Sequence, residues 1–144
     1  MGANVKDLID CYDPNRSLAT ASTPPSSWYT DPNILELEKQ TVFSRSWQFI
    51  GRSEQVHEPG QYISCEIAGE PIFTIKGNDN VLRGFFNVCR HHAAAVITQS
   101  EGTPQSLRCP YHGWTYDLQG ALVRAPEFGG VNDLGRSANG LVPI

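Results

Sequence analysis

The sequence predicts an all-β domain, an antiparallel β-sandwich or small barrel, preceded by an extended N-terminal segment and one short helix. Three observations support this fold class. Beyond residue 46, short runs of β-branched and aromatic residues alternate with turn formers, which is typical of antiparallel strands. One stretch of helical apolar spacing precedes them, and the stretch before that helix has no periodicity. We therefore expect a lead-in segment with one helix over residues 1–46 and the β domain over residues 47–144.

The lead-in segment over residues 16–31 reads RSLATASTPPSSWYTD. It is rich in Ser, Thr, Ala and Pro, which favours an extended chain over a packed element. The helix follows at once. Thr30 or Asp31 can cap it, Pro32 suits its first turn, and the apolar spacing continues to about Ser44.

Short strands joined by close turns are predicted for the rest of the chain. The candidate strands are residues 47–51, 61–67, 71–76, 81–88, 94–97, 106–109, 114–117 and 121–124. The candidate turns are residues 57–60, 68–70, 77–80, 102–105 and 118–120. The turn sequence GNDN at 77–80, between two alternating runs, is a strong hairpin signal.

The composition excludes several classes of function. The 144 residues suffice for one compact domain with its own core, and 40% hydrophobic with 18% charged residues is typical of a soluble globular protein. The apolar runs are too short for a membrane span. A net charge of -4, with eleven scattered Lys and Arg, argues against a nucleic-acid partner. The N-terminal sequence MGANVKDLIDCYDP resembles neither a secretory signal nor a transit peptide.

Two clusters of cysteine and histidine carry the chemistry. They form the pattern C-x-H, seventeen intervening residues, then C-x-x-H, within residues 89–112. A zinc module usually takes two cysteines from one knuckle and two histidines from one helix, whereas each loop here mixes the two ligand types. In a Rieske [2Fe-2S] centre, two thiolates hold one iron and two imidazoles hold the other. A loop at the tip of a hairpin that supplies one Cys and one His can therefore reach both irons, and two such loops would clamp the cluster. The remaining Cys11 and Cys65 are expected to have no catalytic role.

The motifs C-R-H-H at 89–92 and C-P-Y-H-G-W at 109–114 resemble the Rieske domain of ring-hydroxylating and related non-haem iron oxygenases. The resemblance implies a Rieske [2Fe-2S] cofactor held by four residues. The implied ligands are Cys89 and Cys109 on the inner iron and His91 and His112 on the outer iron. His92 and Ala93 depart from the family, which generally has Arg and Gly there, and His92 is expected to be a neighbour of the cluster.

The resemblance extends along nearly the whole chain. The segments TPPSSWYTDP at 23–32, FSRSW at 43–47 and YHGWTYDLQGALVRAPEF at 111–128 are similar to the N-terminal part of the plant choline monooxygenase family. This similarity implies oxidation of choline to betaine aldehyde hydrate in glycine betaine biosynthesis, electrons from ferredoxin, a trimeric enzyme and a chloroplast stroma location, with the cytoplasm as the alternative. Carnitine and aromatic-ring oxygenases share the same Rieske half.

The oxygen-activating site of this family is not expected within these residues. That site is a mononuclear iron held by two His and one carboxylate in a second, catalytic domain. Of the four histidines here, only His57 and His92 are not implied cluster ligands, so the chain alone could transfer an electron but not hydroxylate. A stand-alone Rieske ferredoxin and a zinc-binding structural module are the alternatives.

The residues around the second motif predict a low reduction potential. Respiratory Rieske proteins are similar to one another in having an extra cysteine in each loop and a serine where this chain has Trp114. Fewer hydrogen bonds to the cluster sulfurs destabilise the reduced cluster, so we expect a value toward the low end of the roughly -150 to +300 mV Rieske range. Trp114 and Tyr116 are expected to shield the cluster from water.

Overall fold

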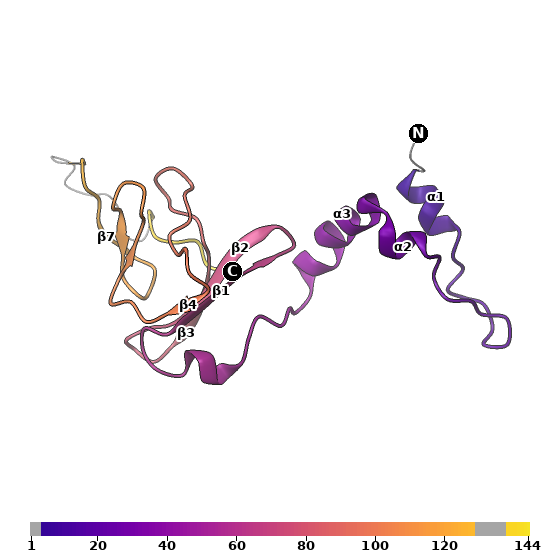
Figure 1. The fold of residues 1–144 in the computed structure, drawn as a ribbon, viewed down its shortest axis with the longest axis horizontal. Helices are drawn as coiled ribbons and strands as arrows, with labels where there is room; N and C mark the ends of the chain where they lie inside the picture. Colours follow the sequence, from indigo (N-terminus) through magenta and orange to yellow (C-terminus); the bar gives the residue numbers. More distant parts are fainter. Residues whose placement is uncertain (1–3, 129–137) are drawn as a thin grey trace. The chain divides into compact units, whose positions relative to one another are not determined.

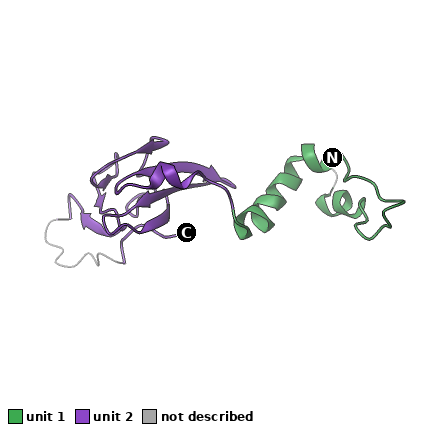
Figure 2. Cartoon of the chain, turned by 90° about the horizontal axis from the view of Figure 1, so that it is seen from below, with its two compact units in different colours: residues 1–47 green, residues 48–144 purple. Residues whose placement is uncertain are grey.

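The chain divides into two compact units, residues 1–47 and residues 48–144 (Figure 2). This computed structural model describes residues 4–128 and 138–144. All residues of the hydrophobic core cluster lie in the second unit, whereas Ile34 is the one buried residue among the described residues of the first.

The first unit is helical. It contains α1 (Val5–Asp10), α2 (Ser27–Thr30) and α3 (Pro32–Thr41), and a 3₁₀ turn, η1 (Phe43–Arg45), follows α3 (Figure 1). The Asp31 carboxylate caps α3 by accepting a hydrogen bond from the Asn33 amide at 2.8 Å, and Pro32 occupies the first turn, so the predicted helix is confirmed.

The prediction of a single helix is wrong in number, because α1 and α2 add two short ones. The lead-in segment is therefore not extended throughout: α2 lies within it. Both helices are too short to show a helical period in the sequence, and neither buries a residue. Instead, α1 is defined by its cap, since the Asn4 side chain accepts a hydrogen bond from the Lys6 amide at 3.1 Å.

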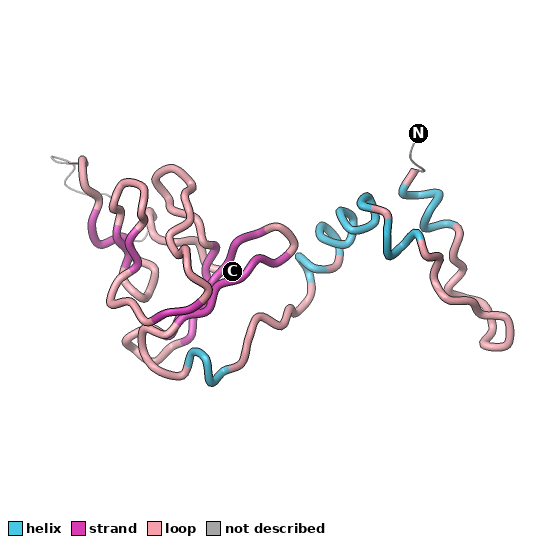
Figure 3. The backbone as a smooth tube through the Cα atoms, in the orientation of Figure 1, coloured by secondary structure: helices cyan, strands magenta, loops and turns pink. Residues whose placement is uncertain are grey.

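The second unit contains two antiparallel sheets, as the all-β prediction requires. The larger sheet has the order β3-β2-β1-β4 and the smaller one the order β5-β6-β7. Their bounds are β1 Tyr62–Ile67, β2 Glu70–Lys76, β3 Leu82–Phe86, β4 Glu101–Gly102, β5 Leu107–Arg108, β6 Thr115–Tyr116 and β7 Leu122–Arg124. A 3₁₀ turn, η2 (Ser53–Val56), precedes β1. Much of this unit is loop rather than strand (Figure 3).

Two predicted strands are absent, and one short strand was missed. Residues 47–51 form no strand, and the side chains of Trp47 and Phe49 are 102% and 82% exposed. β4 falls partly in residues 102–105, where the sequence predicts only a turn. The sequence signal for residues 47–51 was aromatic and β-branched composition, which indicates a strand only where a partner strand exists.

The predicted strand at residues 94–97 is replaced by side-chain hydrogen bonds. The buried Asn87 side chain accepts hydrogen bonds from the amides of Val96 and Ile97 at 3.0 and 2.9 Å, and it donates one to the Ile97 carbonyl at 2.7 Å. Asn87 is 6% exposed. One amide side chain thus satisfies the backbone groups that a strand partner would otherwise satisfy.

The C-terminal residues join the two sheets. Phe86, the last residue of β3, donates its amide hydrogen to the Val142 carbonyl at 3.0 Å. The Leu141 amide donates to the carbonyl of Gly120, in the β6–β7 turn, at 2.8 Å. Gly120 has a φ of 87°, and a Cβ there would lie 2.6 Å from the ring of Phe85, so the turn packs directly on β3. This contact fixes the end of β3 relative to the smaller sheet.

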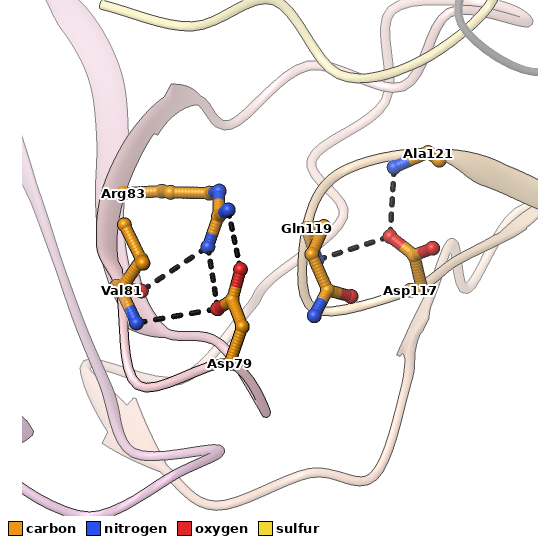
Figure 4. Close-up of polar contacts among 6 residues, drawn as sticks. All are labelled: Asp79, Val81, Arg83, Asp117, Gln119 and Ala121. Atoms are coloured by element: carbon orange, nitrogen blue, oxygen red, sulfur yellow. Dashed lines mark hydrogen bonds and ion pairs between the residues drawn. The ribbon is translucent and has the colours of Figure 1, made fainter.

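Two aspartates organise the turns at residues 77–80 and 118–120 (Figure 4). Asp79 accepts hydrogen bonds from the Val81 amide and from both terminal nitrogens of Arg83, at 2.8 and 2.6 Å. Asp117 accepts hydrogen bonds from the amides of Gln119 and Ala121 at 3.0 and 2.8 Å. The predicted turns at residues 77–80 and 118–120 are therefore confirmed. No helix among the described residues is long and apolar enough to cross a bilayer.

Candidate metal centre

The first loop of the candidate site, residues 89–94, follows β3. The Cys89 amide donates to the Ala94 carbonyl at 2.8 Å, and the Ala93 amide donates to the Cys89 carbonyl at 3.0 Å. Ala93 closes this loop with a φ of 57°, a left-handed conformation that favours glycine. The loop is a tight turn, but the chain after it is not a strand, so the predicted hairpin is only half formed here.

The second loop, residues 109–114, connects β5 to β6 and is a true hairpin tip. Its backbone hydrogen bonds repeat those of the first loop at the same positions. The Cys109 amide donates to the Trp114 carbonyl at 2.8 Å, and the Gly113 amide donates to the Cys109 carbonyl at 3.0 Å. Gly113 has a φ of 74°. The two loops are therefore equivalent in backbone conformation, and each begins with a buried cysteine.

The four implied ligands divide into a buried pair and an outer pair. Cys89 and Cys109 are each 2% exposed, and both thiols are free of disulfides. His91 and His112 are half-buried, with ring centroids 4.7 Å apart. Each loop thus contributes one buried cysteine and one half-buried histidine, and the two imidazoles lie beside each other at the outer side.

His92 belongs to the same imidazole group. Its ring centroid lies 3.9 Å from that of His91 and 5.3 Å from that of His112, and its side chain is exposed. One ring nitrogen from each of these three histidines lies within 4.8 Å of the other two. His92 thus lies beside both histidines that are implied as ligands, as a neighbour of the site would. By contrast, His57 makes contacts with Glu54 and Glu58.

The arrangement does not fit a single tetrahedral ion bound by all four residues. Around one zinc ion, with bonds of about 2.0–2.3 Å, all ligand atoms would lie within about 4 Å of one another. Within the described ranges, the group of three or more candidate ligand atoms that lie close together, all within 4.8 Å of one another, consists of His91, His92 and His112 and includes neither cysteine. Separate thiol and imidazole pairs instead suit two irons joined by bridging sulfides. The zinc-module alternative is disfavoured on this ground.

One buried nitrogen also indicates that His91 is a metal ligand. The Nδ1 atom of His91 is buried and has no hydrogen-bond partner, which ordinarily costs about 1–3 kcal/mol. Burial, followed by the neighbouring His92 and His112, lowers the pKa of His91. A neutral imidazole keeps a nitrogen lone pair free to bind a metal, so iron would satisfy this nitrogen.

An aromatic wall lines the site. Trp114 is 4% exposed, and its ring stacks on His91 with a 4.8 Å centroid separation and 4° between the planes. This stacking fixes the orientation of the His91 ring and excludes water from one of its faces. The predicted shielding role of Trp114 fits this contact.

Tyr116 makes a contact that sequence reasoning missed. Its hydroxyl lies 3.3 Å from the Cys89 sulfur and accepts a hydrogen bond from the Arg90 amide at 3.0 Å. Burial, followed by the hydrogen bond with Cys89, raises the pKa of Tyr116, so the hydroxyl keeps its proton and can donate it to the sulfur. Trp114 lies just before β6 and Tyr116 lies within it, two positions on, and both side chains are buried, but no local signal identifies the sulfur atom across the loops.

Comparisons with known proteins give a consistent result. The family model for the Rieske [2Fe-2S] domain matches residues 46–134. The chain is 35% identical, over 99% of its length, to chloroplastic choline monooxygenase of Arabidopsis thaliana, and covers 33% of that protein. It is 34% identical to the carnitine monooxygenase oxygenase subunit of Acinetobacter baumannii, over 93% of this chain and 35% of that protein. The chain thus spans about a third of the length of these relatives.

Solved structures show the same relationship. The quaternary ammonium Rieske monooxygenase CntA, in complex with gamma-butyrobetaine, superposes with a TM-score of 0.77 at 34% identity, over 85% of this chain and 35% of that one. Naphthalene 1,2-dioxygenase from Rhodococcus sp. gives a TM-score of 0.80 at 29% identity, over 96% of this chain and 30% of that one.

Proposed function

Because the chain belongs to the Rieske [2Fe-2S] domain family, we propose that it is the electron-transfer part of a monooxygenase that oxidises a quaternary ammonium substrate, with choline as the first candidate. The observation that carries this proposal is the pair of equivalent loops, each of which places one buried thiol and one half-buried imidazole at the site. The bound cluster would accept and release one electron at a time.

The proposed ligands are Cys89 and Cys109 for the inner iron and His91 and His112 for the outer iron. Burial of both cysteines and the unpartnered Nδ1 of His91 support this assignment. His91 is preferred to His92 because His91 is half-buried, like His112, while His92 is exposed. Trp114 would hold the His91 ring in place, and Tyr116 would donate a hydrogen bond to the Cys89 thiolate.

The substrate and partners are proposed from the relatives. Choline, glycine betaine and carnitine appear in the names of the relatives, and all three are quaternary ammonium compounds. The mononuclear iron and the substrate pocket would lie in a catalytic domain outside these 144 residues. We propose ferredoxin as the electron donor, a trimeric enzyme, and a chloroplast location as in the plant relatives, with the cytoplasm as the alternative because other relatives are bacterial.

The ligand assignment is tested by single substitutions in the whole chain. The purified protein should be coloured and contain two irons and two sulfides. His91→Ala should abolish this cluster, and the matched control His92→Ala should retain it. A protein that stays colourless after reconstitution with iron and sulfide in the absence of zinc would overturn the proposal, whereas cluster loss in His92→Ala alone would transfer the ligand role to His92.

The substrate is tested with the longest reading frame that contains this chain. Reduced ferredoxin, dioxygen and choline should yield betaine aldehyde, identified by mass spectrometry. Glycine betaine and carnitine serve as competing substrates, and naphthalene serves as a control without an ammonium group. Turnover of carnitine or glycine betaine in preference to choline would correct the substrate but leave the electron-transfer role unchanged.

A further inference from the structure

The three imidazoles at the surface of the site form a group with its own chemistry. Their ring centroids are separated by 3.9, 4.7 and 5.3 Å. We propose that the cluster-free chain binds one divalent transition-metal ion, such as Zn²⁺, through His91, His92 and His112. This site is distinct in composition from the Rieske cluster, because it uses His92 and neither cysteine.

The distances suit such an ion. Three nitrogens bound to one zinc ion at about 2.0–2.1 Å are separated by about 3.4 Å. The present nitrogens lie within 4.8 Å of one another, so small movements of the three rings would bring them onto one ion, and the His92 side chain is exposed and free of core packing. Three histidines with water as a fourth ligand form a known type of zinc site. The exposure of His92 also gives the ion a route from solvent.

The ligand chemistry selects the class of metal. Imidazole suits Zn²⁺, Cu²⁺ and Ni²⁺, whereas Mg²⁺ and Ca²⁺ prefer oxygen ligands. The thiols are not required, because the described group of close ligand atoms contains histidines only. Mg²⁺ is therefore the appropriate negative control for any binding measurement.

This site would be mutually exclusive with the cluster. His91 and His112 are the two residues proposed for the outer iron, so an ion bound between them would block cluster insertion. The third imidazole comes from His92, which is not a proposed cluster ligand. A chain without His92 would offer only two imidazoles, so zinc should compete with cluster loading more strongly in the wild-type chain than in His92→Ala.

The direct test removes the cluster ligands that the zinc site does not use. A Cys89→Ser, Cys109→Ser double variant of the whole chain cannot hold the Rieske cluster but keeps all three imidazoles. Calorimetric titration with ZnCl₂ should show one bound ion per chain, and MgCl₂ should show none. Adding His92→Ala to this variant should weaken zinc binding by more than about tenfold, because even the loss of a hydrogen-bond partner outside the ligand set typically costs about 10–100-fold in metal affinity.

The fourth histidine supplies a matched control. His57→Ala, in the same double variant, removes an imidazole that contacts Glu54 and Glu58 instead. It should leave zinc affinity unchanged. Equal losses from His57→Ala and His92→Ala, or affinity that does not depend on His92, would overturn the proposal.

A second measurement uses the wild-type thiols and covers the case in which the double variant does not fold. Zn²⁺ added before iron and sulfide should slow cluster reconstitution in the wild-type chain, and much less in His92→Ala. Equal slowing in both proteins refutes the three-histidine site. Failure of either protein to load a cluster without zinc would instead refute the ligand assignment, so the two proposals fail separately.

Discussion

At the scale of single residues, the hydrogen bond from Tyr116 to Cys89 should set part of the reduction potential. Hydrogen bonds to cluster sulfurs stabilise the reduced, more negative cluster. Tyr116→Phe removes the hydroxyl, which lies 3.3 Å from the sulfur, and leaves the buried ring. The potential should fall by about 40 mV, the one-electron equivalent of a net contribution of about 1 kcal/mol. Protein-film voltammetry would measure the shift.

A buried tyrosine that only shields the cluster would behave differently. In that case Tyr116→Phe would leave the potential unchanged within error. Tyr111→Phe is the control, because Tyr111 is 66% exposed and its ring lies against His112 at the outer side of the site. That substitution should cause a clearly smaller shift than Tyr116→Phe.

The conformation of Ala93 predicts a stabilising substitution. Ala93 adopts a φ of 57° at the position where the second loop has Gly113. A left-handed alanine costs about 1–2 kcal/mol, and glycine recovers this at an entropic cost of about 0.5–1 kcal/mol. Ala93→Gly should therefore raise the free energy of unfolding by roughly 0.5–1 kcal/mol in urea denaturation.

The neighbouring alanine provides the comparison. Ala94 packs against the core cluster and has no positive φ, so Ala94→Gly should be destabilising. If both substitutions change the unfolding midpoint in the same direction, backbone strain at Ala93 is not the cause.

The residues of the candidate site could largely be predicted from the sequence because they sit in two short motifs. His91 follows Cys89 by two residues and His112 follows Cys109 by three, so the spacing in the sequence is enough to locate both loops. The contact from Tyr116 to Cys89 joins residues 27 positions apart. The approach of His92 to His112 depends on how the two loops pack. Such long-range contacts follow from packing, which no local pattern encodes.

At the scale of elements, Asn87 acts as a partner for a segment that has no strand beside it. Asn87→Ala would leave the amides of Val96 and Ile97 and the Ile97 carbonyl without their bonds in a buried setting. We expect the free energy of unfolding to fall by about 3 kcal/mol. Gln99→Ala, at an exposed position nearby, should change it by less than about 0.5 kcal/mol.

Asn87 also explains why the strand at residues 94–97 is wrongly predicted. The sequence AAVI has the composition of a strand, and its backbone groups are indeed satisfied, but by a side chain. The strands β1, β2 and β3 match their predictions closely because each pairs with a sequence neighbour through a short turn. Local pairing is visible in the sequence, whereas a substitute partner is not.

The β2–β3 hairpin should show a pH-dependent contribution from Asp79. The hydrogen bond from Arg83 is the main reason that the pKa of Asp79 is lowered from 3.8 to about 2. A lowered folded-state pKa means that the stabilisation is present above the unfolded value and is lost as pH falls toward 2. Asp79→Asn should therefore lower the urea midpoint at pH 7, with the difference from wild type shrinking between pH 4 and pH 2. Because the pair is at the surface, the effect should also weaken in high salt.

At the scale of the whole molecule, the uneven distribution of buried residues predicts which part folds alone. The core cluster and both metal loops lie within residues 48–144, while the described part of residues 1–47 buries only Ile34. Deleting residues 1–47 should leave a protein that unfolds cooperatively and carries the same cluster absorption and electron paramagnetic resonance spectrum. Iron content per chain and the thermal unfolding midpoint, compared with the full chain, are the measurements. Loss of the cluster in the shortened protein would show that the helical unit supports the metal loops directly. In that event the division at residue 47 would not separate an independent electron-transfer domain.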